Sequence, residues 1–116
     1  MDHTQLKPIL LFLIAALLGA LGQYLYKTGA ESSANSFVSW VTNYRIILGI
    51  FCYTAVMFLF VYAFKIGGSL TVLYPVYATT FIWALLIGVV FLKEPVTAGK
   101  IGGAVLIILG VFLSTL

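Results

Sequence analysis

Residues 8 to 28 read PILLFLIAALLGALGQYLYKT, an apolar run that is long enough to cross a membrane and has a lysine near its end. A transmembrane helix needs about 20 mainly apolar residues. Three further runs meet this requirement, at residues 45 to 64, 69 to 92 and 97 to 116. The sequence therefore predicts an all-α integral membrane protein, with four transmembrane helices that form one domain over residues 1 to 116.

The composition supports this fold class. With 63% hydrophobic and 8% charged residues, the chain is too apolar to hide its side chains in a soluble core. The apolar runs are continuous, without the alternation typical of a membrane β-barrel. The net charge of +3 is spread over the loops, and this gives no support to nucleic-acid binding.

The connections between the runs differ in length. Residues 65 to 68 and 93 to 95 predict tight turns, whereas residues 29 to 44 predict a longer polar loop. Short turns make neighbouring helices antiparallel. The lysines and arginine slightly favour cytoplasmic first and third loops, with both termini outside, and this small bias leaves insertion in both orientations open.

One stripe of the first run is unusual for a helix in lipid. Gly19, Gly22, Gln23, Tyr26 and Lys27 recur at helical spacing and share a face. A lysine is costly in hydrocarbon unless its ammonium group reaches the headgroups or finds a partner. Two interpretations stay open: Lys27 extends to the headgroups, or it lines a polar cavity together with Gln23.

No acidic residue is predicted at the depth of Lys27, because Asp2, Glu31 and Glu94 lie outside the apolar runs. Glu94 directly precedes the last run, where a carboxylate favours the helix dipole. It is predicted to act there or to pair with Lys93 or Lys100, and recognition of a headgroup is the alternative.

Other polar residues in the runs are candidates for binding. The Arg45 guanidinium suits a phosphate, although anchoring at the interface is the favoured explanation. Pro75 predicts a kink between Tyr74 and Tyr77, whose hydroxyls are candidates either for ligand contact or for helix packing.

The last run contains a seam of small residues. Gly99 and Gly103 form a GxxxG pair, and Gly110 continues it. The seam predicts close helix packing, within the chain or against a second subunit. Because four short helices enclose little volume, a dimer is the economical way to build a larger cavity.

The sequence gives no sign of catalysis. The only histidine, His3, lies in the N-terminal tail, and the only cysteine, Cys52, lies in an apolar run and is interpreted as a buried structural thiol. We therefore expect no enzymatic activity, no cofactor and no metal site.

Residues 67 to 116 combine a Tyr-Pro pair, a Lys-Glu-Pro turn and a glycine-containing last helix, and they resemble the drug/metabolite transporter superfamily. Together with the Gly-Gln pair and lysine at residues 22 to 27, they are most similar to its four-helix branch. That branch includes small multidrug resistance exporters and the paired subunits that flip aminoarabinose-phosphoundecaprenol. The resemblance implies a small multidrug resistance-like bundle.

The resemblance also distinguishes between the two kinds of protein. The exporters exchange protons for cationic substrates at a glutamate in the first span, and the matching position here is Gly19. Tyr77 stands where they have a tryptophan. The flippase subunits are similar to this chain in their Gly-Gln pair, their lysine and the Thr80, Phe81 and Trp83 pattern. Their similarity implies that Lys27 neutralises a phosphate, with Gln23, Tyr74 and Tyr77 as hydrogen-bonding groups.

We therefore expect a multi-pass transporter subunit of a bacterial inner membrane, which moves a polyprenyl-phosphate-linked sugar or a related anionic lipid. Its partners would be membrane lipid and a second subunit, either a copy or a related four-helix chain. One alternative is an exporter of cationic compounds that works as an antiparallel dimer. Another is an accessory membrane subunit that transports nothing.

Overall fold

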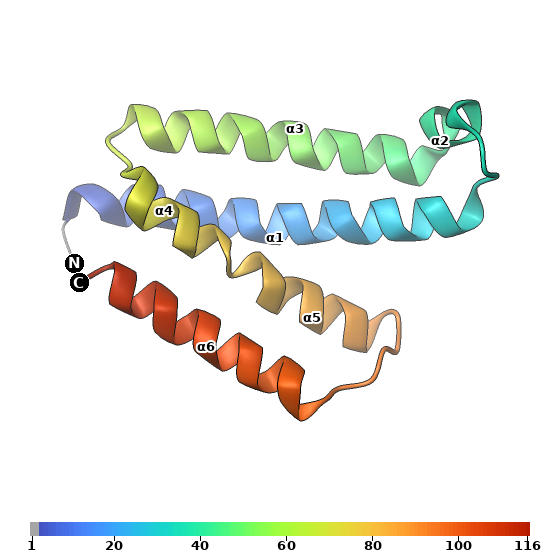
Figure 1. Cartoon of the computed structure of the whole chain (residues 1–116). Coiled ribbons are helices and arrows are strands. Elements are labelled where there is room, and N and C mark those ends of the chain that lie inside the picture. Colours follow the sequence, from blue (N-terminus) through green and yellow to red (C-terminus); the bar gives the residue numbers. More distant parts are fainter. Residues whose placement is uncertain (1–2) are drawn as a thin grey trace.

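The computed structural model describes residues 3 to 116, and Asp2 lies outside this range. Within it the fold is all-helical and contains no strand, as predicted. Figure 1 shows the helices in chain order: α1 (His3–Ser32), α2 (Phe37–Thr42), α3 (Tyr44–Lys65), α4 (Leu70–Tyr77), α5 (Thr80–Val90) and α6 (Ala98–Ser114).

Three helical segments are long and apolar enough to cross a membrane: Gln5–Ser32, Tyr44–Lys65 and Leu70–Val90. They fit a multi-pass membrane protein. The fourth, α6, is apolar but has only 17 residues. At about 1.5 Å per residue it is roughly 26 Å long, a little less than a hydrocarbon core of about 30 Å. The fourth crossing therefore stays a prediction.

The antiparallel pair α1 and α3 forms the longest contact in the molecule (Figure 1). Glycines let the two backbones approach, since a Cβ atom on Gly22 would lie 2.8 Å from the Tyr53 ring. Likewise, a Cβ atom on Gly49 would lie 2.6 Å from the Tyr26 ring. The two tyrosine rings stack, with centroids 5.3 Å apart and an interplanar angle of 4°. Part of the predicted α1 stripe therefore serves helix packing.

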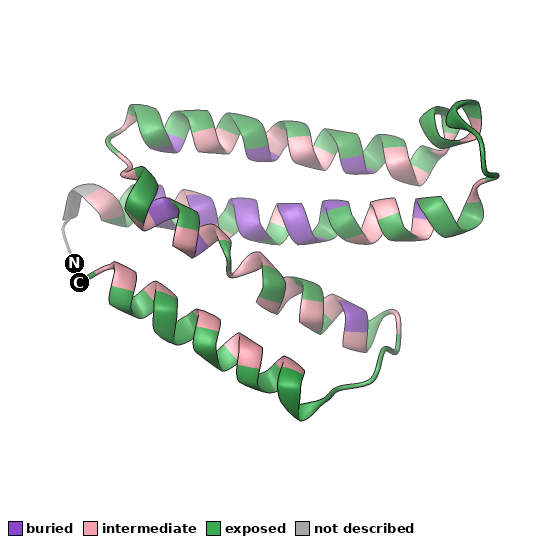
Figure 2. Ribbon diagram, viewed as in Figure 1, coloured by how far each residue is buried: buried purple, intermediate pink, exposed green. Residues whose placement is uncertain are grey.

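The hydrophobic core lies where α4 crosses this pair. The Phe12 ring stacks on the Phe60 ring at 4.4 Å, and the Tyr77 ring meets Phe60 edge-on at 4.9 Å. Leu73 and Val76 of α4 are fully buried against them. Figure 2 shows buried residues concentrated along α1, whereas α2 and α6 bury none.

The prediction of a polar loop at residues 29 to 44 is wrong in part. Helix α1 continues to Ser32, and α2 occupies residues 37 to 42. Side chains that cap helix N-termini explain the second helix and the start of the third, because they satisfy otherwise unpaired backbone N–H groups. Ser36 accepts a hydrogen bond from the Ser39 N–H, and Asn43 accepts from those of Arg45 and Ile46.

The tight turn at residues 65 to 68 is confirmed. Gly67 has a φ of 107°, a conformation that favours glycine. Gln5 of α1 holds this turn with both ends of its amide: Nε2 donates to the Gly67 carbonyl at 3.0 Å, and Oε1 accepts from the Ser69 N–H at 3.0 Å.

The third span is divided into α4 and α5 at Ala78 and Thr79, a few residues beyond the expected kink at Pro75. The Ala78 N–H donates to the Pro75 carbonyl at 3.0 Å, and the Thr79 N–H donates to Val76 at 3.1 Å, so the chain tightens into a turn here. The Thr80 hydroxyl then donates to the Ala16 carbonyl at 3.0 Å. This bond fixes the start of α5 on α1.

Candidate functional site

A small recess lies between the second half of α1 and the end of α5. Its volume is about 150 Å³. Gln23, Tyr24 and Lys27 line it from α1, and Glu94 lines it from the loop after α5, while the remaining lining residues are apolar or glycine. The recess therefore brings together an ammonium group, a carboxylate, an amide and a phenol in a largely apolar molecule.

Glu94 reaches the recess because the loop folds back over α5. Its N–H donates to the Gly88 carbonyl at 3.0 Å, and a Cβ atom on Gly88 would lie 2.5 Å from Glu94 Oε1. The predicted role at the N-terminus of the last helix belongs instead to Thr97, whose hydroxyl accepts from the Lys100 N–H at 3.2 Å. The Glu94 carboxylate is thus free of a capping role and lines the recess.

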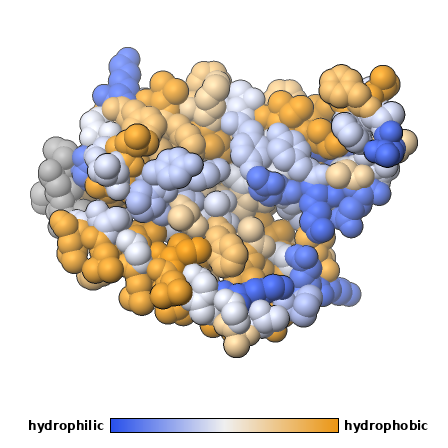
Figure 3. Space-filling view, viewed as in Figure 1, coloured by the Kyte–Doolittle hydropathy of each residue, from blue (hydrophilic) through white to orange (hydrophobic). Residues whose placement is uncertain are grey.

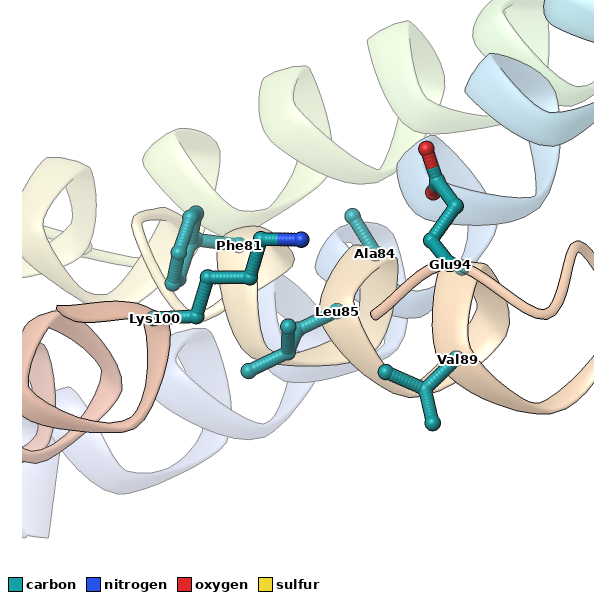
Figure 4. A pocket seen from close by; sticks show the side chains of 7 residues that line it. Phe81, Ala84, Leu85, Val89, Glu94 and Lys100 are labelled. Carbon is teal, nitrogen blue, oxygen red and sulfur yellow. The ribbon is translucent and has the colours of Figure 1, made fainter. Parts of the chain in front are cut away.

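A second recess of about 250 Å³ lies on the other side of Glu94, between α5 and the start of α6. Glu94 and Gly88 line both recesses, and Lys100 lines the second (Figure 4). Lys100 Nζ donates to the Pro95 carbonyl at 2.7 Å, so the lysine holds the loop that carries Glu94.

A third, open depression of about 400 Å³ lies between the ends of α1 and α3, and Tyr24 lines it as well as the first recess. Arg45 Nη1 donates to the Thr28 hydroxyl at 3.2 Å, and Arg45 Nε donates to the Tyr44 hydroxyl at 3.1 Å. Glu31 also lines this depression. Figure 3 shows hydrophilic side chains on both sides of a hollow at this end of the molecule.

The predicted site residues divide into three groups. Gln23, Lys27 and Glu94 share the first recess, and Arg45 lines the adjoining depression. Tyr26 packs on α3. The remaining two predicted tyrosines, Tyr74 and Tyr77, do not line these recesses: Tyr74 is 67% exposed, and Tyr77 lies in the aromatic core.

Sequence reasoning missed Tyr24, the residue that the first recess and the open depression share. A signal for it exists, because Tyr24 precedes Lys27 by three residues, close to one helical turn, and therefore adjoins it on the helix surface. Its ring also packs near Phe91, with centroids 6.1 Å apart, which places α1 beside the end of α5.

Gly19 is buried beneath Tyr77. The Tyr77 hydroxyl occupies the place where a Cβ atom on residue 19 would project, and the Tyr77 Cζ would be 3.3 Å from it. Because Tyr77 is itself packed between Phe12 and Phe60, it has little room to move. A carboxylate at position 19 therefore requires this part of the core to rearrange.

Among the described residues, no other helix packs tightly against the glycines of the α6 seam, and Gly110 lines a cavity that it shares with Pro75 of α4. A Cβ atom on Gly110 would meet no atom within 4 Å, and one on Gly99 would meet only the Thr97 hydroxyl, at 3.9 Å. Gly103 faces the Phe81 ring at 3.9 Å, an ordinary contact distance. Packing of this seam against a second subunit stays a prediction.

No protein-family model, curated protein or solved structure matches this chain. Within the described residues, no three histidine, cysteine, aspartate or glutamate side chains gather in a way that could hold a metal ion. The first recess places an ammonium group, a carboxylate, an amide and a phenol around one small volume.

Proposed function

We propose that this chain is a transporter subunit that moves a polyprenyl-phosphate-linked sugar, or a related anionic lipid, across a bacterial inner membrane. The observation that supports this function best is the position of Lys27 in a recess with Gln23 and Tyr24. An ammonium group pairs with a phosphate, while the amide and phenol donate hydrogen bonds to phosphate or sugar oxygens.

Glu94 restricts the charges that we propose for the headgroup. Lys27 and Glu94 line the same recess, so a ligand with both an anionic and a cationic group satisfies both side chains. An amino sugar joined to a phosphate has this pair of charges. The polyprenyl tail would stay in the surrounding lipid, next to the apolar outer surface of α5 and α6.

The size of the recess favours a complex of two subunits. Pockets for small molecules usually measure about 300 to 1,000 Å³, and the first recess measures about 150 Å³. The first recess alone is therefore small for a sugar phosphate. We propose that a second copy, or a related four-helix chain, completes the site by packing on the α6 seam, where a Cβ atom on Gly110 would find open space.

Binding of undecaprenyl phosphate, compared with that of uncharged undecaprenol, tests the phosphate site. We expect the protein to prefer the phosphate in native mass spectrometry, Lys27→Gln to remove most of this preference, and Lys27→Arg to keep it. Lys65→Gln is the matched control, because Lys65 is also exposed but lies at the C-terminal end of α3, away from the recess that Lys27 lines. Equal preference in Lys27→Gln and Lys65→Gln would refute a phosphate site at Lys27.

Transport is tested separately, in reconstituted vesicles that contain a fluorescent lipid-linked sugar and any partner subunit that co-purifies. Lys27→Gln should abolish flipping, whereas Lys65→Gln should not. Unchanged flipping in Lys27→Gln would contradict the proposed role of the lysine and would favour an accessory subunit.

One observation favours export of cations as a second candidate function. Glu94 lines two recesses, and the aromatic side chains of Tyr24 and Phe81 contribute to their walls. A carboxylate with aromatic neighbours suits a quaternary ammonium ion. In that case, the purified protein should bind such a compound, and Glu94→Gln should weaken the binding strongly. No binding to the unaltered protein would exclude this candidate.

A further inference from the structure

Helix α2 separates its polar and apolar residues completely. At about 100° of rotation per residue, one half of the helix presents only apolar side chains, and the other half presents hydroxyl groups. The apolar half consists of Phe37, Val38, Trp40 and Val41.

The apolar half of α2 is uncovered. The exposed fractions are 72% for Phe37, 69% for Val38, 43% for Trp40 and 45% for Val41, and the helix buries no residue. The hydroxyl groups, in contrast, form hydrogen bonds with backbone groups in or next to α2. Ser36 caps it, Ser39 accepts from the Ala34 N–H at 2.8 Å, and Thr42 donates to the Val38 carbonyl at 2.7 Å.

The direction of α2 differs from that of the long helices. Figure 1 shows α2 nearly end-on at the end of the α1 and α3 pair, while α1 and α3 run lengthwise across the view. A helix that lies crosswise to two membrane-spanning helices is parallel to the membrane plane. Because the end of the pair is also the end of two apolar spans, α2 lies at the level where hydrocarbon meets headgroups.

We propose that α2 is an interfacial helix that inserts Phe37, Val38, Trp40 and Val41 into the headgroup layer of the bilayer. Six residues of helix measure about 9 Å, far too short to cross a membrane. Amphipathic helices bury an apolar face of this kind at the interface, and tryptophan is enriched there. Because α2 has no charged side chain, the membrane contact depends on its apolar face rather than on anionic lipid.

Asn43 connects α2 to α1 and α3 through hydrogen bonds. Its N–H donates to the Trp40 carbonyl at 3.3 Å, and its side chain caps α3 through Arg45 and Ile46. Its amide also donates to the Ser32 hydroxyl at the end of α1 at 3.2 Å. The level of α2 in the bilayer therefore sets the level of α1, α3 and the Arg45 depression between their ends.

Tryptophan fluorescence tests the position directly, because the chain contains only Trp40 and Trp83. In the full-length Trp83→Phe variant, Trp40 is the only reporter. In phosphatidylcholine vesicles, we expect lipids labelled near the headgroup to quench its emission much more than lipids labelled deep in the acyl chain. Aqueous iodide should quench it weakly. Trp40→Phe, which reports on Trp83 of α5, is the control.

Three results would overturn the proposal. Strong quenching by iodide would place α2 in water, and strong quenching by the deep label would place it in the hydrocarbon. Protection from iodide and from both lipid labels would show that a protein surface covers it. Each result is independent of what the protein transports.

A matched pair of substitutions separates the two faces in the same background. Val41→Asp puts a charge on the apolar face, so we expect the Trp40 emission to shift to the red and iodide quenching to rise. Thr42→Asp puts the same charge on the polar face and should change neither. Equal effects of the two substitutions, with the helix content by circular dichroism unchanged, would contradict the proposal.

Discussion

At the scale of the single residue, the contact between Gly19 and Tyr77 links the fold to the proposed function. The tyrosine hydroxyl fills the space that a side chain at position 19 would need. Position 19 therefore has no room for a carboxylate side chain unless this part of the core rearranges.

We predict that Gly19→Ala lowers the free energy of unfolding by about 1 to 3 kcal/mol, because the added methyl group overpacks the core. Tyr77→Phe removes the oxygen that the methyl group would meet, so Gly19→Ala should cost less in a Tyr77→Phe background. A double-mutant cycle, measured by unfolding in detergent, checks this coupling. Additive effects would show that residues 19 and 77 do not meet.

At the scale of the helix, the close packing of α1 on α3 depends on Gly22. Gly22→Ala places a methyl group against the Tyr53 ring, and we expect a loss of about 1 to 3 kcal/mol of stability. Gly102→Ala in α6 is the matched control, because a Cβ atom there meets no atom within 4 Å. Its effect should be neutral, or stabilising by up to about 1 kcal/mol. Thermal unfolding in dilute detergent compares the two, and similar losses would contradict the packing role of Gly22.

The start of α5 depends on a hydrogen bond to another helix. Thr80→Val removes the bond to the Ala16 carbonyl, and we expect a loss of about 1 kcal/mol. Thr54→Val is the control, since the Thr54 hydroxyl bonds only to the Ile50 carbonyl within α3, at 2.9 Å. Unfolding with a denaturing detergent should show the loss for Thr80→Val alone. Equal behaviour of the two variants would show that the bond does not stabilise the fold.

At the scale of the whole molecule, the arrangement of helices predicts which residues share a side of the membrane. The α3–α4 turn and the end of α6 lie at one end, and the α1–α3 connection and the α5–α6 loop lie at the other (Figure 1). If α6 crosses the membrane despite its length of 17 residues, its end must return to the side of the α3–α4 turn.

Single cysteines in a Cys52→Ala background test this prediction. With a reagent that cannot cross the membrane, Lys65→Cys and Leu116→Cys should be labelled to the same extent. Asn35→Cys and Val96→Cys should also match each other, but at a different extent, because they lie on the other side of the membrane. This pairing holds even if the chain inserts in both orientations, provided that one orientation predominates. Matching values for Leu116→Cys and Val96→Cys would show that α6 does not cross.

The sequence predicted the helices well because apolar runs and turn residues are local signals. The long runs appear as α1, α3 and the divided third span, and Gly67 marks the turn before α4. Helix α2 was missed altogether although Ser36 and Asn43 are good capping residues, because the surrounding polar residues also suit a loop.

The candidate site was harder to predict because one helical stripe faces more than one neighbour. Spacing alone placed Tyr26 with Lys27, but the structure stacks Tyr26 on α3 and turns Lys27 toward α5. Tyr24, which adjoins Lys27, belonged to no predicted stripe. A stripe fixes which residues are neighbours on one helix, and it does not specify which helix packs against each of them.

By itself, the sequence determined that the chain is helical and has several runs apolar enough to cross a membrane, because long apolar runs fold as helices wherever water is excluded from the backbone. Only the tertiary structure decided that Glu94 folds back over Gly88 to share a recess with Lys27. Residues 27 and 94 lie far apart in the chain, and their proximity depends on the break between α4 and α5 and on the Thr80 hydrogen bond that fixes α5 on α1. Such contacts are set by packing between segments, which local spacing does not encode.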